Sequence, residues 1–172
     1  MKITFNRPVI DGTKALVIEQ DGVNIGEMRR WFRPQNERPA NSPIYDVNII
    51  VESRQATYKI TQQSFTLREG HSWILEENTN KVGEVVGAKG LFKRHQIELV
   101  SESYPHFNIV TTWGFKGNGI ISMNNKEIGD TTTSGFVKNS KVLIDTEPID
   151  SLIDPALLAG ITYTYWSSFN KG

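Results

Sequence analysis

The C-terminal stretch DPALLAGITYTYWSSF, residues 154–169, is the most apolar run in the chain and constrains the fold more than any other feature. Asp154 is suited to cap a helix N-terminus, and Pro155 fits the first helical position, where its missing N–H is not needed. Between residues 156 and 166 every residue is apolar or small except two threonines. The pattern predicts a helix over about residues 155–167 that is apolar on every side and therefore buried all round.

Three environments could bury such a helix. Its apolar part is about eleven residues, or roughly 17 Å at 1.5 Å per residue, which is too short for a bilayer core of about 30 Å. A helix lying on a membrane surface would need a cationic polar face, and this run carries no charge. We therefore expect the helix to fill the centre of the protein itself. A strand over ITYTYW, residues 161–166, is the alternative, because alternating threonine and aromatic residues favour β-structure.

The rest of the chain has the composition of strands joined by turns. About twelve candidate strands, rich in β-branched and aromatic residues, alternate with Gly, Asn and Asp, which tolerate positive φ. This number of strands in one domain indicates a closed barrel or a sandwich. The clearest candidates are residues 44–52, 55–60, 64–67, 73–75, 91–100 and 107–115.

Residues 33–43 are the one segment with the composition of a loop. Their three prolines are incompatible with the interior of a sheet, so we predict a surface loop. The segment is not expected to be a domain boundary, because the roughly thirty residues before it would hardly fold alone. Residues 1–172 are therefore predicted to form a single domain.

One hairpin pattern occurs three times. The segments are DGVNIGEM (residues 21–28), NTNKVGEV (78–85) and MNNKEIGD (123–130). Each contains a tight turn, an apolar Ile or Val, a glycine and an acidic residue. The glycine would let the returning strand bulge or coil sharply, and three such hairpins would suit the closure of a barrel. Chance similarity among short hairpins is the alternative interpretation.

These observations predict a mostly β fold, a closed antiparallel barrel of about twelve strands around a buried C-terminal helix. The segments WILEENTNKVGEVVG, LFKRHQIELV, ISMNNKEIGD and VLIDTEPIDSLIDPALLAGITYTYW resemble the tubby C-terminal-like superfamily, in particular its LURP-one-related and small bacterial members. The resemblance covers about residues 72–166 and implies the same fold, whereas the loop at 33–43 departs from the family. Tubby-like domains bind phosphoinositide headgroups through Lys and Arg on neighbouring strands, while small LURP-one-related members often have no assigned activity.

The sequence offers little for catalysis. The absence of cysteine excludes disulfides, thiol catalysis and thiolate metal sites. His71, His95 and His106 lack metal-ligand spacing, and no nucleophile elbow, P-loop or dinucleotide-binding glycine motif occurs. We therefore predict a non-enzymatic protein without a metal or cofactor.

The chain has no net charge, because 19 Lys and Arg balance 19 Asp and Glu, so no overall field favours nucleic acid. Any electrostatic binding must therefore come from local clusters of charge. Two basic clusters with aromatic neighbours are candidates to bind anionic lipid headgroups. They are Arg29, Arg30 and Arg33 in MRRWFR, and Lys89, Lys93 and Arg94 in KGLFKRH. Such clusters would also suit stacked nucleic-acid bases. The alternative is a solvated strand face, with Trp31 inward and Arg30 and Phe32 outward.

The N-terminus lacks a secretory signal and no run approaches the ~20 apolar residues of a membrane span, so we predict a cytoplasmic protein, or one peripheral at a membrane. The expected function is a non-enzymatic module that binds anionic phospholipid surfaces through the outer barrel wall. One alternative is a protein–protein adaptor. Another is a ligand-carrying barrel with the tail packed outside and a lumen lined by Trp73, Trp113 and Phe115.

Overall fold

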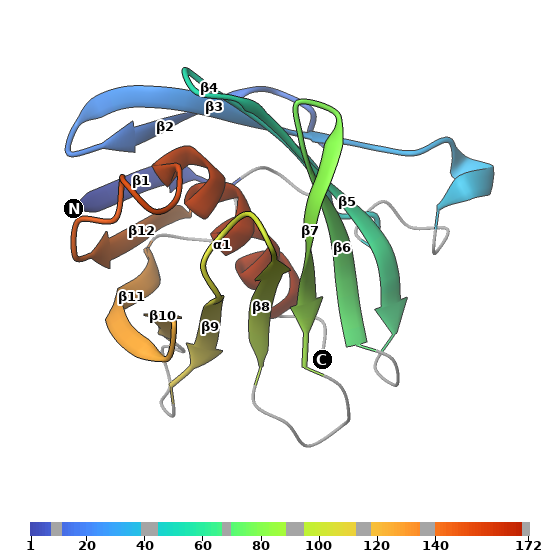
Figure 1. Ribbon diagram of the computed structural model, residues 1–172. Helices are drawn as coiled ribbons and strands as arrows, with labels where there is room; N and C mark the ends of the chain where they lie inside the picture. Colours follow the sequence, from blue (N-terminus) through green and yellow to red (C-terminus); the bar gives the residue numbers. More distant parts are fainter. Residues whose placement is uncertain are drawn as a thin grey trace.

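The computed structural model describes residues 1–7, 12–38, 45–66, 70–88, 95–112, 118–134 and 140–169. In this part of the chain twelve strands form one closed antiparallel barrel, as predicted, and one α-helix follows the last strand (Figure 1). Strands adjacent in sequence are adjacent in the barrel, and β1 closes it by pairing with β12. The strands are β1 (Lys2–Asn6), β2 (Leu16–Gln20), β3 (Val23–Trp31), β4 (Asn48–Ser53), β5 (Thr57–Thr66), β6 (Gly70–Glu77), β7 (Asn80–Gly87), β8 (Gln96–Ser101), β9 (Phe107–Thr111), β10 (Gly119–Met123), β11 (Lys126–Ser134) and β12 (Lys141–Thr146).

The three repeated hairpins share one geometry. Both central turn residues have positive φ in each, which is typical of the type I′ turns that match strand twist; they are Asp21–Gly22, Asn78–Thr79 and Asn124–Asn125. In each returning strand the residue before the glycine is bulged out of register; these residues are Ile25, Val82 and Ile128. A Cβ on any of the three glycines would overlap a carbonyl oxygen of the following strand. The barrel therefore bends in the same way at β3, β7 and β11.

Gly129 offers the most stringent test of these bends. Its φ is +157°, and a Cβ there would overlap the carbonyl oxygen of Asp145. We expect Gly129→Ala to lower the free energy of unfolding by about 3 kcal/mol, because backbone strain and a backbone clash combine. Gly22→Ala is the matched control, since Gly22 has φ +82° but nothing within 4 Å, and it should cost about 1 kcal/mol. Urea denaturation measures the free energy of unfolding of both variants. Equal losses would show that the close approach of Gly129 to the backbone of Asp145 does not contribute to stability.

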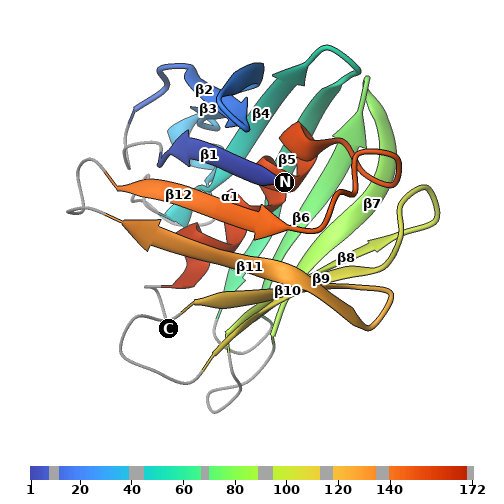
Figure 2. The same ribbon diagram turned by 90° about the vertical axis from the view of Figure 1, so that its left-hand side faces the viewer.

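The helix α1 (Pro155–Phe169) lies inside the barrel. Residues 155–168 are all buried, and the helix contacts β1, β2, β3, β4, β5 and β8 around the circumference. In Figure 2, β1 and β12 pass in front of α1, and β5 and β6 lie behind it. The predicted core helix is confirmed and the strand alternative for residues 161–166 is wrong. The ligand-carrier hypothesis required a tail packed outside the barrel, and this requirement is not met.

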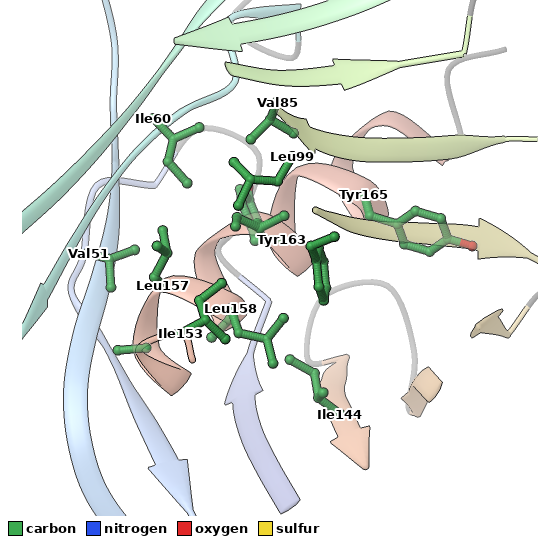
Figure 3. Packing of buried hydrophobic residues seen from close by; sticks show 14 of the residues in the cluster. Val51, Ile60, Val85, Leu99, Ile144, Ile153, Leu157, Leu158, Tyr163 and Tyr165 are labelled. Atoms are coloured by element: carbon green, nitrogen blue, oxygen red, sulfur yellow. The ribbon is translucent and has the colours of Figure 1, made fainter. Parts of the chain in front are cut away.

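Side chains of the helix and the wall form one packed core. In Figure 3 the side chains of Leu157 and Leu158 lie between Val51 and Ile60 on one side and Ile144 on the other. All five side chains are fully buried. Complete burial of an aliphatic side chain of this size contributes about 1.5–3 kcal/mol, so the helix supplies a large share of the hydrophobic stabilisation.

Asp154 forms the predicted N-cap and also fastens the helix to the wall. Its Oδ1 accepts the N–H of Ala156 at 2.8 Å. Its Oδ2 accepts the hydroxyl of Ser53 at 2.6 Å and that of Tyr58 at 3.1 Å. Burial raises the pKa of the Tyr58 phenol, which keeps this donor protonated. One carboxylate thus joins the helix start to β4 and β5.

The strand boundaries depart from the prediction where side chains replace the backbone ladder. Residues 55–60 and 64–67 were expected as two strands, but β5 is continuous, with an irregular register between Gln62 and Ser64. β4 begins at Asn48 instead of residue 44. The described part of the Pro-rich loop, up to Arg38, lies outside the strands and contains the short 3-10 helix η1 (Gln35–Glu37). Residues 39–43 of that loop lie outside the described residues.

Candidate functional site

In the first basic cluster, the inward and outward side chains are the reverse of the alternative in which Trp31 points inward and Arg30 points outward. Met28 and Arg30 are buried on the inner side of β3, whereas Arg29 is exposed on the outer wall. Trp31 also faces outward and its ring lies 4.9 Å from Nζ of Lys59. The expectation of Trp31 inward and Arg30 outward is therefore wrong, because a cation covers the indole outside and Arg30 finds partners inside.

Arg29 and Arg30 occupy different environments. Arg29 forms an exposed ion pair in which its Nη2 lies 2.8 Å from Oε1 of Glu52. Arg30 is only 3% exposed; it donates to the carbonyl of Asp46 at 3.0 Å and lies 4.7 Å from the centroid of the Phe32 ring. Of the two guanidinium groups, only that of Arg29 is on the surface.

Arg33 anchors the chain beyond β3 to a buried carboxylate. Its N–H donates to Oδ2 of Asp46 at 2.9 Å and its Nε donates to Oδ1 at 3.0 Å. Its Nη2 donates to the carbonyl of Gln62 at 2.7 Å. Asn48 adds a bond from Nδ2 to Oδ1 of Asp46 at 2.8 Å, and Asp46 is fully buried. The Arg33 charge is therefore compensated within the protein.

Gln62 extends this network across the irregular part of β5. Its Oε1 accepts the N–H of Val47 at 2.6 Å, and its own N–H donates to Oδ1 of Asn48 at 2.9 Å. The indole of Trp73 donates to the carbonyl of Val47 at 2.9 Å. These bonds satisfy backbone groups that the ladder leaves free at the start of β4. The sequence signal was two polar residues, Asp46 and Asn48, on either side of Val47 where the apolar strand β4 begins.

The second basic cluster, Lys89, Lys93 and Arg94, lies outside the described residues. The next residue, His95, packs against the end of α1. Its Nε2 lies 3.0 Å from the carbonyl oxygen of Tyr165, and the two ring centroids are 4.7 Å apart. Burial lowers the pKa of the His95 imidazole. The chain therefore enters β8 beside the C-terminal turns of the helix.

The cationic side chain of Arg7 contacts the same end of α1. Nη2 of Arg7, which follows β1, donates to the carbonyl of Trp166 at 2.6 Å. The last carbonyl groups of a helix carry partial negative charge, so a guanidinium there stabilises the helix. Burial lowers the pKa of Arg7. Arg7 and His95 thus bring two basic side chains to one end of the barrel.

The two ends of the barrel differ in their connections. We call the end with the turns at 21–22, 54–55, 78–79 and 124–125 the hairpin end, and the opposite end, where α1 finishes, the loop end. Among the described residues, the charged side chains of the loop end are Arg7, Lys14, Arg30, Arg33, Arg38 and Lys141, against Glu37 and Asp46. In the sequence, the remaining connections between these strand ends contain Arg68, Lys89, Lys93, Arg94, Lys116 and Lys138, against Asp11 and Glu69. The loop end therefore has a surplus of basic residues.

Comparisons with known proteins provide no assignment: no family model, no curated protein and no solved structure matches the chain. Within the described ranges, no three His, Asp or Glu side chains are grouped so that they could hold a metal ion. The one long helix of the described chain is too short to cross a membrane. The tubby-like resemblance remains a prediction.

Proposed function

We propose that the protein is a non-enzymatic module that binds anionic phospholipid surfaces through its loop end. The observation that carries this proposal is the surplus of basic residues at the loop end of a chain whose total charge is zero. Each Lys or Arg near an anionic membrane surface contributes about 1 kcal/mol, so several cations together suffice for peripheral attachment. The tubby-like resemblance supports the same class of ligand, and the cytoplasmic leaflet supplies such lipids.

The proposed contact residues differ in their availability. Lys14 and Lys141 are exposed at the loop end and form no ion pair within the described chain. Lys89, Lys93 and Arg94 belong to the proposal through their place in the sequence, in the connection between β7 and β8. Arg30 and Arg33 are engaged inside the protein, and Arg29 is paired on the wall, so we assign these three no direct contact with lipid.

Vesicle flotation tests this function. The purified protein is mixed with phosphatidylcholine vesicles, with or without phosphatidylserine, at low and at physiological salt. We expect flotation only with the anionic vesicles, and less of it at higher salt, because counterions screen exposed charges. Flotation with neutral vesicles that is insensitive to salt would contradict an electrostatic mechanism. Absence of flotation in every condition would reject the lipid function and leave an acidic protein surface as the partner to seek.

A further inference from the structure

The hairpin end has the opposite charge to the loop end. Its acidic residues are Glu19, Asp21, Glu77, Glu102, Glu127, Asp145, Glu147 and Asp150, and its basic residues are Lys2, Arg54, Lys81 and Lys126. Two of these bases are used in ion pairs at the same end: Lys2 lies 3.9 Å from Asp145, and Lys126 lies 2.8 Å from Glu147. The hairpin end is therefore acidic.

The wall between the two ends is also net acidic among the described residues, because Arg29 and Lys59 stand against Glu27, Glu52, Glu76, Glu84, Glu98 and Asp130. Each of the two cations has a carboxylate on a neighbouring strand: Arg29 lies 2.8 Å from Glu52, and Lys59 lies 3.9 Å from Glu76. Glu27 and Asp130 add acidic groups without an ion pair in the described chain. Among the described residues of this wall, a flat anionic surface would meet no cation without a carboxylate partner.

We propose that the barrel docks end-on, with the loop end on the anionic bilayer and the hairpin end directed away from it. This inference rests on the proposed function and adds the orientation of the bound protein. The field of an anionic surface attracts the loop end and repels both the hairpin end and the wall, where carboxylates outnumber cations. One orientation is therefore favoured over the others.

The barrel is long enough that, in this orientation, salt screens the repulsion between the acidic hairpin end and the anionic surface. The nine residues of β3 extend over about 30 Å at roughly 3.3 Å per residue, whereas charges are screened within about 8 Å at physiological ionic strength. When the loop end touches the surface, the acidic hairpin end lies well beyond the range of repulsion. In a side-on arrangement, part of the acidic end would lie within that range.

Because the chain contains no cysteine, a single introduced cysteine gives a unique labelling position. Thr13→Cys places an environment-sensitive fluorophore at the loop end, and Ser103→Cys places the same fluorophore at the hairpin end; both positions are exposed and neither is charged. The labelled proteins are mixed with phosphatidylserine-containing vesicles that carry a nitroxide quencher on some headgroups. Flotation of each labelled protein is measured in parallel.

We expect the fluorophore at position 13 to be quenched several-fold more strongly than the fluorophore at position 103. Equal quenching at both positions in protein that floats would overturn end-on docking while leaving the lipid function intact, as would stronger quenching at position 103. Absence of flotation would reject the lipid function and the orientation with it. Thermal unfolding of each labelled protein checks that the barrel is folded.

Discussion

Leu158→Asp is expected to prevent folding. Leu158 is fully buried in α1 at the centre of the barrel. Loss of its packing costs about 2–5 kcal/mol, and a buried carboxylate without a partner adds several more. The total, about 5 kcal/mol or more, is comparable with the whole stability of a typical domain, which is about 5–15 kcal/mol. Circular dichroism and urea denaturation of the purified variant measure the loss.

Leu152→Asp is the matched control for this prediction. Leu152 lies shortly before the helix and is 54% exposed. The same chemical change there should alter the free energy of unfolding by no more than about 0.5 kcal/mol, because water hydrates the new carboxylate. Two variants of similar stability would mean that α1 is not the core of the barrel.

Asp46→Ala is expected to have the next largest effect. The substitution leaves the guanidinium of Arg33 and the amide of Asn48 without their buried acceptor. Removal of one partner from a buried ion pair costs about 3–5 kcal/mol, because the other charge stays in the protein without compensation. The free energy of unfolding, obtained from urea denaturation, should fall by this amount.

Glu52→Ala provides the comparison on the outer wall. It removes the carboxylate of an exposed ion pair with Arg29 at nearly the same N–O distance as the pair of Arg33 and Asp46. Exposed pairs contribute about 0–1 kcal/mol, so this variant should remain close to the parent protein. A loss equal to that of Asp46→Ala would show that burial does not distinguish the two pairs.

The features predicted correctly from the sequence have local signals. Asp154 and Pro155 mark the start of the helix, and the apolar residues on every face of the run predict its burial. The repeated hairpins were recognisable because positive φ requires particular residues, and because the returning strand approaches its neighbour too closely for a side chain at Gly26, Gly83 and Gly129. Such signals depend on a few adjacent residues and need no knowledge of the tertiary structure.

The environments of the basic residues depend on tertiary contacts. Arg30 and Trp31 are adjacent, and hydrophobicity alone favours burial of the indole. In the structure Lys59 covers the outward-facing Trp31, and the buried Arg30 donates to the carbonyl of Asp46. Arg33 looked like a surface cation because its partner Asp46 is thirteen residues away, across a Pro-rich segment. Pairing between segments this far apart leaves no periodic pattern in the sequence.

The separation of charge between the basic loop end and the acidic hairpin end could not be predicted without the strand order. In a barrel whose neighbouring strands are consecutive, alternate connections lie at the same end. Sorted in this way, the connections of the loop end are mainly basic and those of the hairpin end mainly acidic, although the total charge is zero. The information was present in the sequence, but it required the correct number and boundaries of the strands.

The most direct test of lipid binding through the loop end is vesicle flotation of two variants that lose the same number of positive charges at opposite ends of the barrel. The loop-end variant replaces Lys14, Lys93, Arg94 and Lys141 by Ala, and the hairpin-end variant replaces Lys2, Lys81, Arg54 and Lys126 by Ala. Each loses four positive charges. At about 1 kcal/mol per cation near the surface, the loop-end variant should bind anionic vesicles roughly a thousandfold more weakly, whereas the hairpin-end variant should bind like the parent. Equal weakening of both would show that net charge, and not the loop end, determines binding.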